Sequence, residues 1–389
     1  FLSASIRVTC GRFLFICMNN MDYRRARLLL PPLALLAAAS LAWGARHAWI
    51  DSADLEKRAV EVRRVVERDD PYASPDMTYP PTAPAVFVPL IAPIDGRWLR
   101  PAWLGLNLLA FVAVCGLILR LWARDWPAWL RWTFCLVAAA SKPVHLGIGL
   151  GQFHLVPLAL LLGGLYLIEA RRPVVAGLLV GASLVKPTMS LPWLAMLAAR
   201  RQWRTLVVAA GFQGAALAGV SAWLGRSPPM LIREWLARAR TQGASGLIDV
   251  PSVLGRLGVD AISVPAVSLG VLLLGSAAIV AARRRSSLAP AALCGFVAAI
   301  FTYHRPYDLV LLLPALAYFL DEARRREPDR LGPRWVAAIV FGLMLVAPNN
   351  PAIVGRWVEA AYDPVFIATS YAMLAALLLD VIDNRGRPL

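Results

Sequence analysis

Charged residues are scarce in this sequence. Asp, Glu, Lys and Arg make up 16% of its 389 residues, whereas 59% are hydrophobic. A soluble domain of this length carries charge over its whole surface, at roughly a quarter of its residues. Here the charges stand in short clusters between long apolar runs. The sequence therefore excludes a soluble protein with one apolar patch and indicates an integral membrane protein.

Cysteine is also rare, and it shows no pattern. The five cysteines have no paired spacing, and three of them lie within or beside apolar runs. They are typical of small buried side chains and exclude a disulfide framework. No set of carboxylates, histidines or cysteines has the spacing of metal ligands, so we expect no metal site and no cofactor.

Acidic residues are outnumbered, 24 against 40 basic ones, which gives a formal charge of +16. Such an excess would suit a nucleic-acid partner if it covered one face. Instead the arginines stand in twos and threes at the ends of apolar runs, as in the cytoplasmic loops of membrane proteins. We therefore expect membrane lipids as partners and no nucleic acid. Seven clusters are expected on the cytoplasmic side, at residues 24–27, 120–131, 171–172, 200–204, 283–285, 324–334 and 385–387.

The apolar runs predict helices, because they are continuous and because a lipid-exposed backbone must satisfy its own hydrogen bonds. With the seven clusters inside, the fold class is an all-α polytopic membrane protein of about twelve transmembrane helices in the plasma (inner) membrane. The expected helices cover residues 28–50, 101–121, 132–150, 153–169, 173–199 as a hairpin of two, 205–223, 263–282, 288–303, 307–320, 333–348 and 363–380. The run 83–94 is too short to span, so we expect it to be re-entrant or interfacial.

The beginning of the chain differs from the rest. Met18 or Met21, followed by an arginine cluster, makes a better start than Phe1. We therefore treat residues 1–17 as an over-extended start with no fold assigned. Residues 18–389 are expected to form a single membrane domain. Its two long outer segments are 51–100 and 224–262, and no internal repeat relates its halves.

The first outer segment holds the chemistry. Seven of the 24 acidic residues fall within residues 51–70. Leu55, Ala59, Val62 and Val66 recur at helical spacing there, which predicts an amphipathic helix lying at the membrane interface. Asp54 would then lie at headgroup depth, where a carboxylate can accept the proton of an attacking hydroxyl. The alternative is that Asp54 only caps this helix.

Four motifs of this region carry a resemblance, in the order Asp54-Leu55-x-x-x-Ala59, Asp70-Pro71-Tyr72, Tyr79-Pro80-Pro81 and Pro89-Leu90. Later segments continue it: Gly151-Gln152, Ala176-Gly177-Leu178, Lys186-Pro187 and Thr302-Tyr303-His304. Together they resemble glycosyltransferase family 87, whose members have the GT-C fold and use polyprenyl-phosphate sugars. The mycobacterial lipid α-mannosyltransferases are among them. The resemblance spans about residues 51–320.

The resemblance implies roles for individual residues. Asp54 would be the general base, and His304 would face the phosphate of the donor. Candidates for the acceptor or sugar site are Tyr72, Tyr79, Gln152 and His154. The sequence departs from the family pattern at Leu55, Lys57 and Arg58, where the family has aromatic residues, and at His154, where it has a small polar one. These departures leave the identity of sugar and acceptor open.

Basic residues on the outer side are candidates for holding that phosphate, since cations stabilise the charge of a departing phosphate. Arg233 and Arg238 lie in the second outer segment, where ordinary solvated arginines are the alternative. His304 and Arg305 lie between two predicted helices, and a backbone carbonyl could equally satisfy the histidine. Lys186 lies at the turn of the intramembrane hairpin, a position that marks a functional site unless the side chain snorkels to a headgroup.

The sequence thus predicts an inverting membrane glycosyltransferase with its active site outside the cytoplasm. It would transfer a hexose, with mannose as the first choice, from a polyprenyl-phosphate sugar donor to a glycolipid or envelope-glycan acceptor. Two alternatives stay open. A lipid-linked oligosaccharide flippase or other transporter also needs many helices and intramembrane cations. A catalytically inactive relative that binds lipids would explain the departures at residues 55, 57 and 58.

Overall fold

The computed structural model describes residues 27–73, 77–241, 248–256, 258, 264–284, 286–328, 332–346 and 351–383. The segment 1–17 and parts of the second outer segment lie outside these ranges. Every regular element in the described ranges is a helix. The α-helices are α3 (Leu30–Ile50), α4 (Ala53–Val66), α5 (Pro84–Ile91), α6 (Gly96–Trp122), α7 (Ala128–Ala140), α8 (Lys142–Gly149), α9 (Leu155–Glu169), α10 (Pro173–Ser183), α11 (Pro187–Ala199), α12 (Trp203–Leu224), α13 (Pro228–Thr241), α14 (Val250–Arg256), α15 (Val264–Ala281), α16 (Leu288–Phe301), α17 (Leu313–Arg326), α18 (Pro333–Val346) and α19 (Pro351–Asp383).

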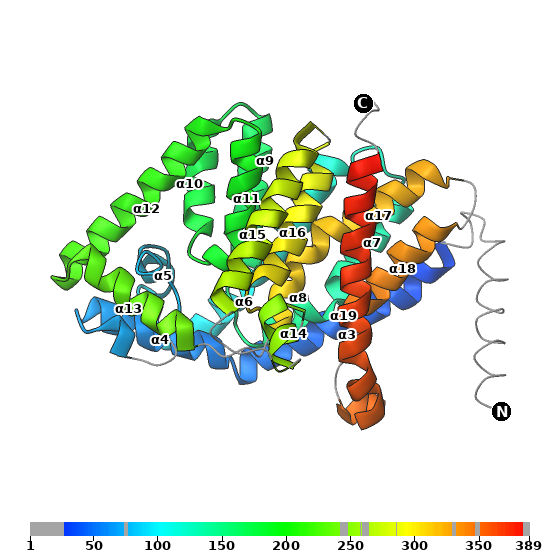
Figure 1. The fold of residues 1–389 in the computed structure, drawn as a ribbon. Coiled ribbons are helices and arrows are strands. Elements are labelled where there is room, and N and C mark those ends of the chain that lie inside the picture. Colours follow the sequence, from blue (N-terminus) through cyan, green and yellow to red (C-terminus); the bar gives the residue numbers. More distant parts are fainter. Residues whose placement is uncertain are drawn as a thin grey trace.

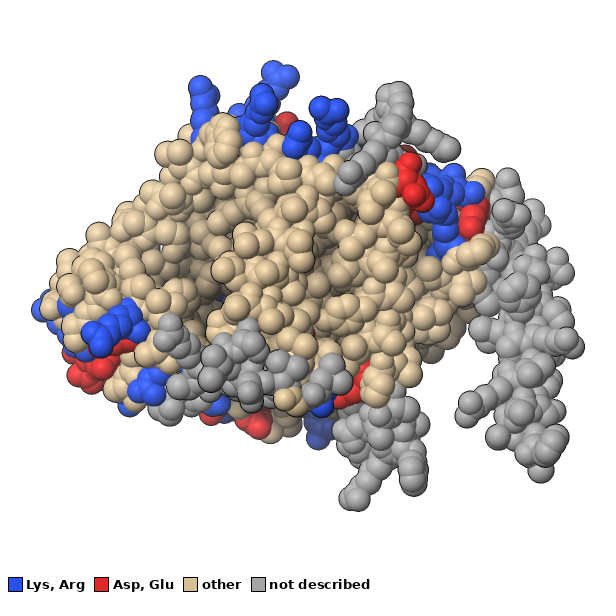
Figure 2. All heavy atoms as spheres, in the orientation of Figure 1, with Lys and Arg blue, Asp and Glu red and all other residues tan. Residues whose placement is uncertain are grey.

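Charge divides the molecule into two ends and an apolar middle. The turns that join α9 to α10, α11 to α12 and α15 to α16 lie at the upper end in Figure 1, and α4 and α13 lie along the lower end. Figure 2 shows Lys and Arg side chains over the upper turns and both signs of charge below, with an almost uncharged band between. A band of this kind is expected where side chains face lipid.

Five of the described helices are long and apolar enough to cross a membrane: Leu30–Ile50, Gly96–Trp122, Trp203–Leu224, Pro265–Arg284 and Asp363–Asp383. Five shorter apolar helices accompany them, namely α7, α9, α10, α16 and α18. The all-helical membrane architecture is thus confirmed. The number of twelve crossings stays a prediction, because several of the apolar helices are too short to span alone.

The single helix expected at 132–150 is wrong. The structure ends α7 at Ala140 and begins α8 at Lys142, with an extended backbone at Ser141 (ψ 139°). Pro143 explains the break, because its nitrogen has no proton to donate to the carbonyl four residues earlier. The hairpin expected at 173–199 is confirmed as α10 and α11, which meet at residues 184–186.

Small residues let α10 pack closely against α12. A Cβ atom on Gly177 would lie 2.7 Å from the carbonyl oxygen of Thr205, and one on Gly181 would lie 2.9 Å from the Cβ atom of Phe212. Two glycines four residues apart form one face of α10, a spacing that brings helices together in membranes. This packing fixes the hairpin, and with it the turn that carries Lys186.

The amphipathic helix of the first outer segment is α4, and it packs against α5. Leu55 and Val62 are buried as the spacing predicts, but Val66 is exposed and Val65 is buried in its place. The buried face also contains Arg58, which pairs with Glu61 and stacks over the ring of Tyr79 at 4.6 Å from its centre. Packing, rather than strict apolar periodicity, therefore decides which face of α4 is inside.

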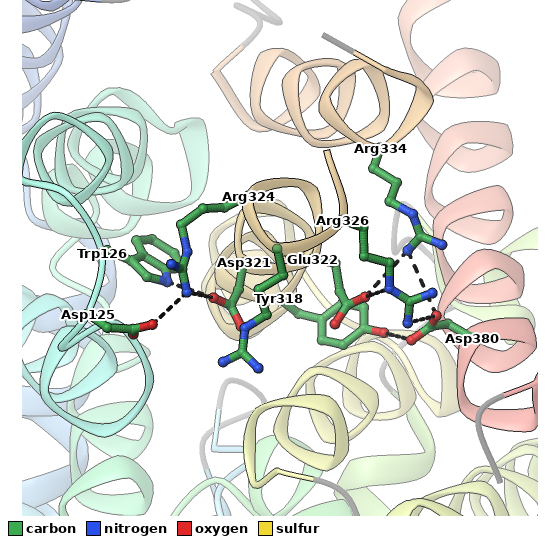
Figure 3. Close-up of polar contacts among 10 residues, drawn as sticks. Asp125, Trp126, Tyr318, Asp321, Glu322, Arg324, Arg326, Arg334 and Asp380 are labelled. Carbon is green, nitrogen blue, oxygen red and sulfur yellow. Dashed lines mark hydrogen bonds and ion pairs between the residues drawn. The ribbon is translucent and has the colours of Figure 1, made fainter. Parts of the chain in front are cut away.

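A network of charged side chains joins helices at the Arg-rich end (Figure 3). Asp321 of α17 accepts hydrogen bonds from Trp126 at 2.9 Å and from Arg324 at 3.1 Å. Asp380 of α19 accepts from Tyr318 and, at 2.7 Å, from Arg326. These contacts hold the α6–α7 connection and α19 against α17.

Candidate active site

Asp54 lies at the start of α4, directly after α3 ends. Its backbone N–H donates to the carbonyl of Leu150 at 3.1 Å, which ties α4 to the connection between α8 and α9. Its carboxylate accepts a hydrogen bond from the Gln152 side chain through Oδ2. The predicted base is therefore held from the backbone and from one carboxylate oxygen, and the other oxygen has no such bond to Gln152.

Gly151 makes this arrangement sterically feasible. Its backbone is left-handed (φ +69°), and an added Cβ atom would lie 2.8 Å from the Cβ atom of Leu55 and 3.2 Å from that of Ser52. On its other side, Trp103 donates its indole N–H to the Gly151 carbonyl at 2.8 Å. Only glycine fits a left-handed backbone in so narrow a gap. The Gly-Gln motif thus brings Gln152 to Asp54.

A second group of polar side chains surrounds Asp308, a residue that the sequence analysis did not single out. Asp308 lies in the 3₁₀ helix η4 (Pro306–Leu312) and is 4% exposed. Its Oδ1 accepts a hydrogen bond from Lys186 Nζ, and its Oδ2 lies 3.2 Å from His304 Nδ1. The hydrogen-bond partner of His304 Nδ1 is therefore a carboxylate and not a backbone carbonyl. The signal in the sequence was a lone acidic residue at the start of an apolar run.

Contacts of Tyr307 connect the group around Asp308 with the connection that holds Asp54. The ring of Tyr307 lies 5.3 Å from Lys186 Nζ and 5.9 Å from the fully buried ring of His154, each measured to the ring centre of Tyr307. Gln152, the partner of Asp54, stands two residues before His154 in the chain. Residues from α4, the α8–α9 connection, the α10–α11 turn and η4 are therefore linked by one series of contacts.

The two candidate tyrosines differ in position. The ring of Tyr79 packs edge-on against Phe87, at 5.1 Å between ring centres, and Phe87 packs against Phe153. Tyr79 is therefore linked through Phe87 to the α8–α9 connection. Tyr72 is buried in a separate cluster with Met77, Val220 and Leu231, and its hydroxyl donates to the Tyr79 carbonyl at 3.1 Å. Burial raises the pKa of Tyr72 far above its usual range, so its hydroxyl stays a donor. Tyr72 thus supports the backbone of Tyr79 through this hydrogen bond.

The candidate arginines are dispersed. Arg238 donates to the carbonyl of Tyr72 at 3.0 Å, and Arg233 is exposed on α13. Arg305 is exposed beside the ring of Tyr303, at 5.5 Å from its centre. In the described ranges no hydrogen bond or ion pair joins Arg233 or Arg305 to Lys186 or His304, although Arg305 follows His304 in the chain. Nor do the same ranges contain a group of three or more His, Cys, Asp or Glu side chains that could hold a metal ion.

Comparison with known proteins assigns the family. The model of glycosyltransferase family 87 matches residues 77–306, which is more than half of the chain. No curated protein and no solved structure matches. The matched region contains Gln152, His154, Lys186 and His304 and stops two residues before Asp308. The chain therefore belongs to glycosyltransferase family 87, and it is a membrane glycosyltransferase.

Proposed function

We propose that the protein transfers a hexose from a polyprenyl-phosphate carrier to a hydroxyl group of a glycolipid or envelope glycan, on the extracytoplasmic side of the plasma membrane. Mannose is the first choice of sugar. The observation that carries the proposal is the series of contacts that links Asp54, held by Gln152, through His154 and Tyr307 to the basic side chains of Lys186 and His304. Glycosyl transfer from a lipid phosphate needs a base on one side of the sugar and cations on the other.

In the proposed reaction, the acceptor oxygen attacks the anomeric carbon while Asp54 takes the hydroxyl proton. The bond between that carbon and the phosphate oxygen breaks, and its electron pair leaves with the polyprenyl phosphate. Attack from the side opposite the phosphate inverts the anomeric centre. Lys186 and His304 hold the phosphate and stabilise its developing charge, and the exposed Arg305 next to them extends this cationic set. In this proposal Tyr79, Gln152 and His154 line the sugar or acceptor site.

The arginines of α13 have less support as ligands of the donor phosphate. Arg238 already donates to the Tyr72 carbonyl, and that bond supports the backbone beside Tyr79. Arg233 is exposed and free to meet lipid headgroups. We propose that these two act on the approach of anionic lipids and not on the reacting phosphate.

Replacement of the base tests the proposal. We expect Asp54→Asn in lipid-reconstituted protein to lower the rate of transfer from radiolabelled polyprenyl-phosphate sugars by about 1000-fold, because an amide cannot accept the proton. Binding of the donor should persist. The matched control is Asp51→Asn, an exposed carboxylate three residues earlier, which should transfer at the rate of the parent protein.

Two results would contradict the proposal. Transfer by Asp54→Asn at the parental rate would remove Asp54 as the base. Movement of the labelled donor across the bilayer by the parent protein, without any transfer of its sugar, would favour the transporter.

A further inference from the structure

Asp308 has no part in the reaction as proposed, yet it is the most fully engaged side chain of the site. Each of its two carboxylate oxygens meets a different partner, Lys186 at Oδ1 and His304 at Oδ2. Both Asp308 and His304 are buried, with exposed fractions of 4% and 2%. The Lys186 side chain is 13% exposed, and an ammonium group so largely removed from water is strongly unfavourable without a counter-charge. Asp308 therefore allows Lys186 to stay charged.

The same two partners also have a side that Asp308 does not use. The second ring nitrogen of His304, Nε2, is buried and has no hydrogen-bond partner among the residues that the structure describes. Lys186 Nζ also lies 5.3 Å from the centre of the Tyr307 ring. A phosphate that reached Lys186 Nζ and His304 Nε2 would therefore meet both basic groups while Nδ1 of the histidine stays on Asp308.

We propose that Asp308 is the internal counter-ion of the donor-phosphate site and competes with the phosphate for Lys186. Before a phosphate binds, the carboxylate balances the ammonium charge and orients His304 through Nδ1. When a lipid phosphate enters, Lys186 and His304 Nε2 bind it at the expense of the contact with Asp308. After transfer, Asp308 recovers Lys186, which weakens the hold on the polyprenyl phosphate and lets it leave. The inference rests on the proposed function, because it takes a carrier phosphate as the ligand.

The direction in which the dissociation constant for a phosphate probe changes in a variant tests this inference. We use farnesyl phosphate as the probe and farnesol as its uncharged counterpart, both titrated into the purified full-length protein in detergent. Asp308→Asn removes the competing charge, so we expect its dissociation constant for farnesyl phosphate to fall about tenfold, or about 1.4 kcal/mol. Damage to the fold would change affinity in the opposite direction. Farnesol should bind both proteins alike.

Two further variants serve as controls. Asp321→Asn removes another buried, ion-paired carboxylate of the same chain segment, at the Arg-rich end (Figure 3). It should leave the dissociation constant for farnesyl phosphate unchanged. Lys186→Gln should raise that constant at least tenfold. If Asp308→Asn does not give folded protein, Asp308→Ser also removes the charge and carries the same expectation.

The outcomes separate the two proposals. If the parent protein binds farnesyl phosphate no better than farnesol, the donor site itself fails, and the role of Asp308 fails with it. If the parent binds farnesyl phosphate through Lys186 but the neutral variants of Asp308 bind it equally or more weakly, only the counter-ion role is overturned.

Discussion

The carboxylate of Asp54 owes its orientation to one amide side chain. Gln152 donates to Oδ2, and the backbone N–H of Asp54 donates to Leu150. Both partners come from the connection between α8 and α9. A base that is fixed before the substrate arrives loses less entropy in the transition state. Gln152 is thus a positioning residue in the proposed reaction, in addition to its place beside the sugar site.

We expect Gln152→Ala to lower the turnover number of transfer by about tenfold to a hundredfold, the range for losing a hydrogen bond to a charged group. The protein should stay folded, since one oxygen of a half-buried carboxylate can be rehydrated. Gln213→Ala is the control, because Gln213 also makes one side-chain hydrogen bond, to the carbonyl of Gly181 at 2.7 Å, but lies in α12. Equal effects of the two variants on turnover would show that the Gln152 bond has no special role.

Single residues were predictable from the sequence where their chemistry is unusual for their surroundings. Lys186 and His304 stand out because polar side chains are costly between membrane helices, and the structure brings them together. Asp308 was missed because its role depends on its hydrogen-bond partners, and one of them, Lys186, is 122 residues away in the chain. The burial of Tyr72 in a separate cluster was not predictable for a similar reason, because a motif does not show what a side chain packs against.

At the scale of elements, the site lies where helices are interrupted. Three interruptions precede residues of the site in the chain: the break at Ser141, the turn before α11 and the connection from α16 to η4. Interrupted backbone at membrane depth is tolerated where protein buries it or where it lines a cavity. Prolines mark two of these breaks in advance, at Lys186-Pro187 and Arg305-Pro306. The break before Lys142-Pro143 was overlooked because the apolar residues on both sides of it were interpreted as one helix.

The contact between α4 and the α8–α9 connection depends on Gly151. We expect Gly151→Ala to destabilise the protein by about 2 kcal/mol, because alanine in a left-handed backbone is strained and its methyl group would collide with Leu55 and Ser52. A lower melting temperature in detergent and a slower transfer rate would report this loss. Gly211→Ala in α12 is the control: nothing lies within 4 Å of its added Cβ, so helix propensity should stabilise it slightly. Equal melting temperatures of the two variants would contradict the close approach.

At the scale of the whole molecule, the distribution of charge predicts its orientation. The arginines of the upper turns should face the cytoplasm, which places α4, and Asp54 with it, outside. The two ends and the apolar band were predictable, because these depend on composition along the chain. The helix register of α4 and the pairing of distant helices were not, because side-chain packing decides them.

Cysteine labelling tests the orientation. In a variant without the five native cysteines, we expect Glu67→Cys, at the exposed end of α4, to react with a membrane-impermeant maleimide added to intact cells. Arg204→Cys, exposed at the start of α12, should react only after the cells are opened. The reverse pattern would invert the topology and put the proposed active site in the cytoplasm.

The bond from Gln152 to Asp54 has a consequence for the product. With Oδ2 bonded to Gln152, Oδ1 is the oxygen that faces the proton of an acceptor, and the Gln152 bond restricts rotation of the carboxylate. Among the several hydroxyls of a sugar acceptor, only the one that reaches this oxygen can be deprotonated. The regiochemistry of the new glycosidic linkage would then be set by the protein backbone at residues 150–152 and not by the intrinsic reactivity of the acceptor.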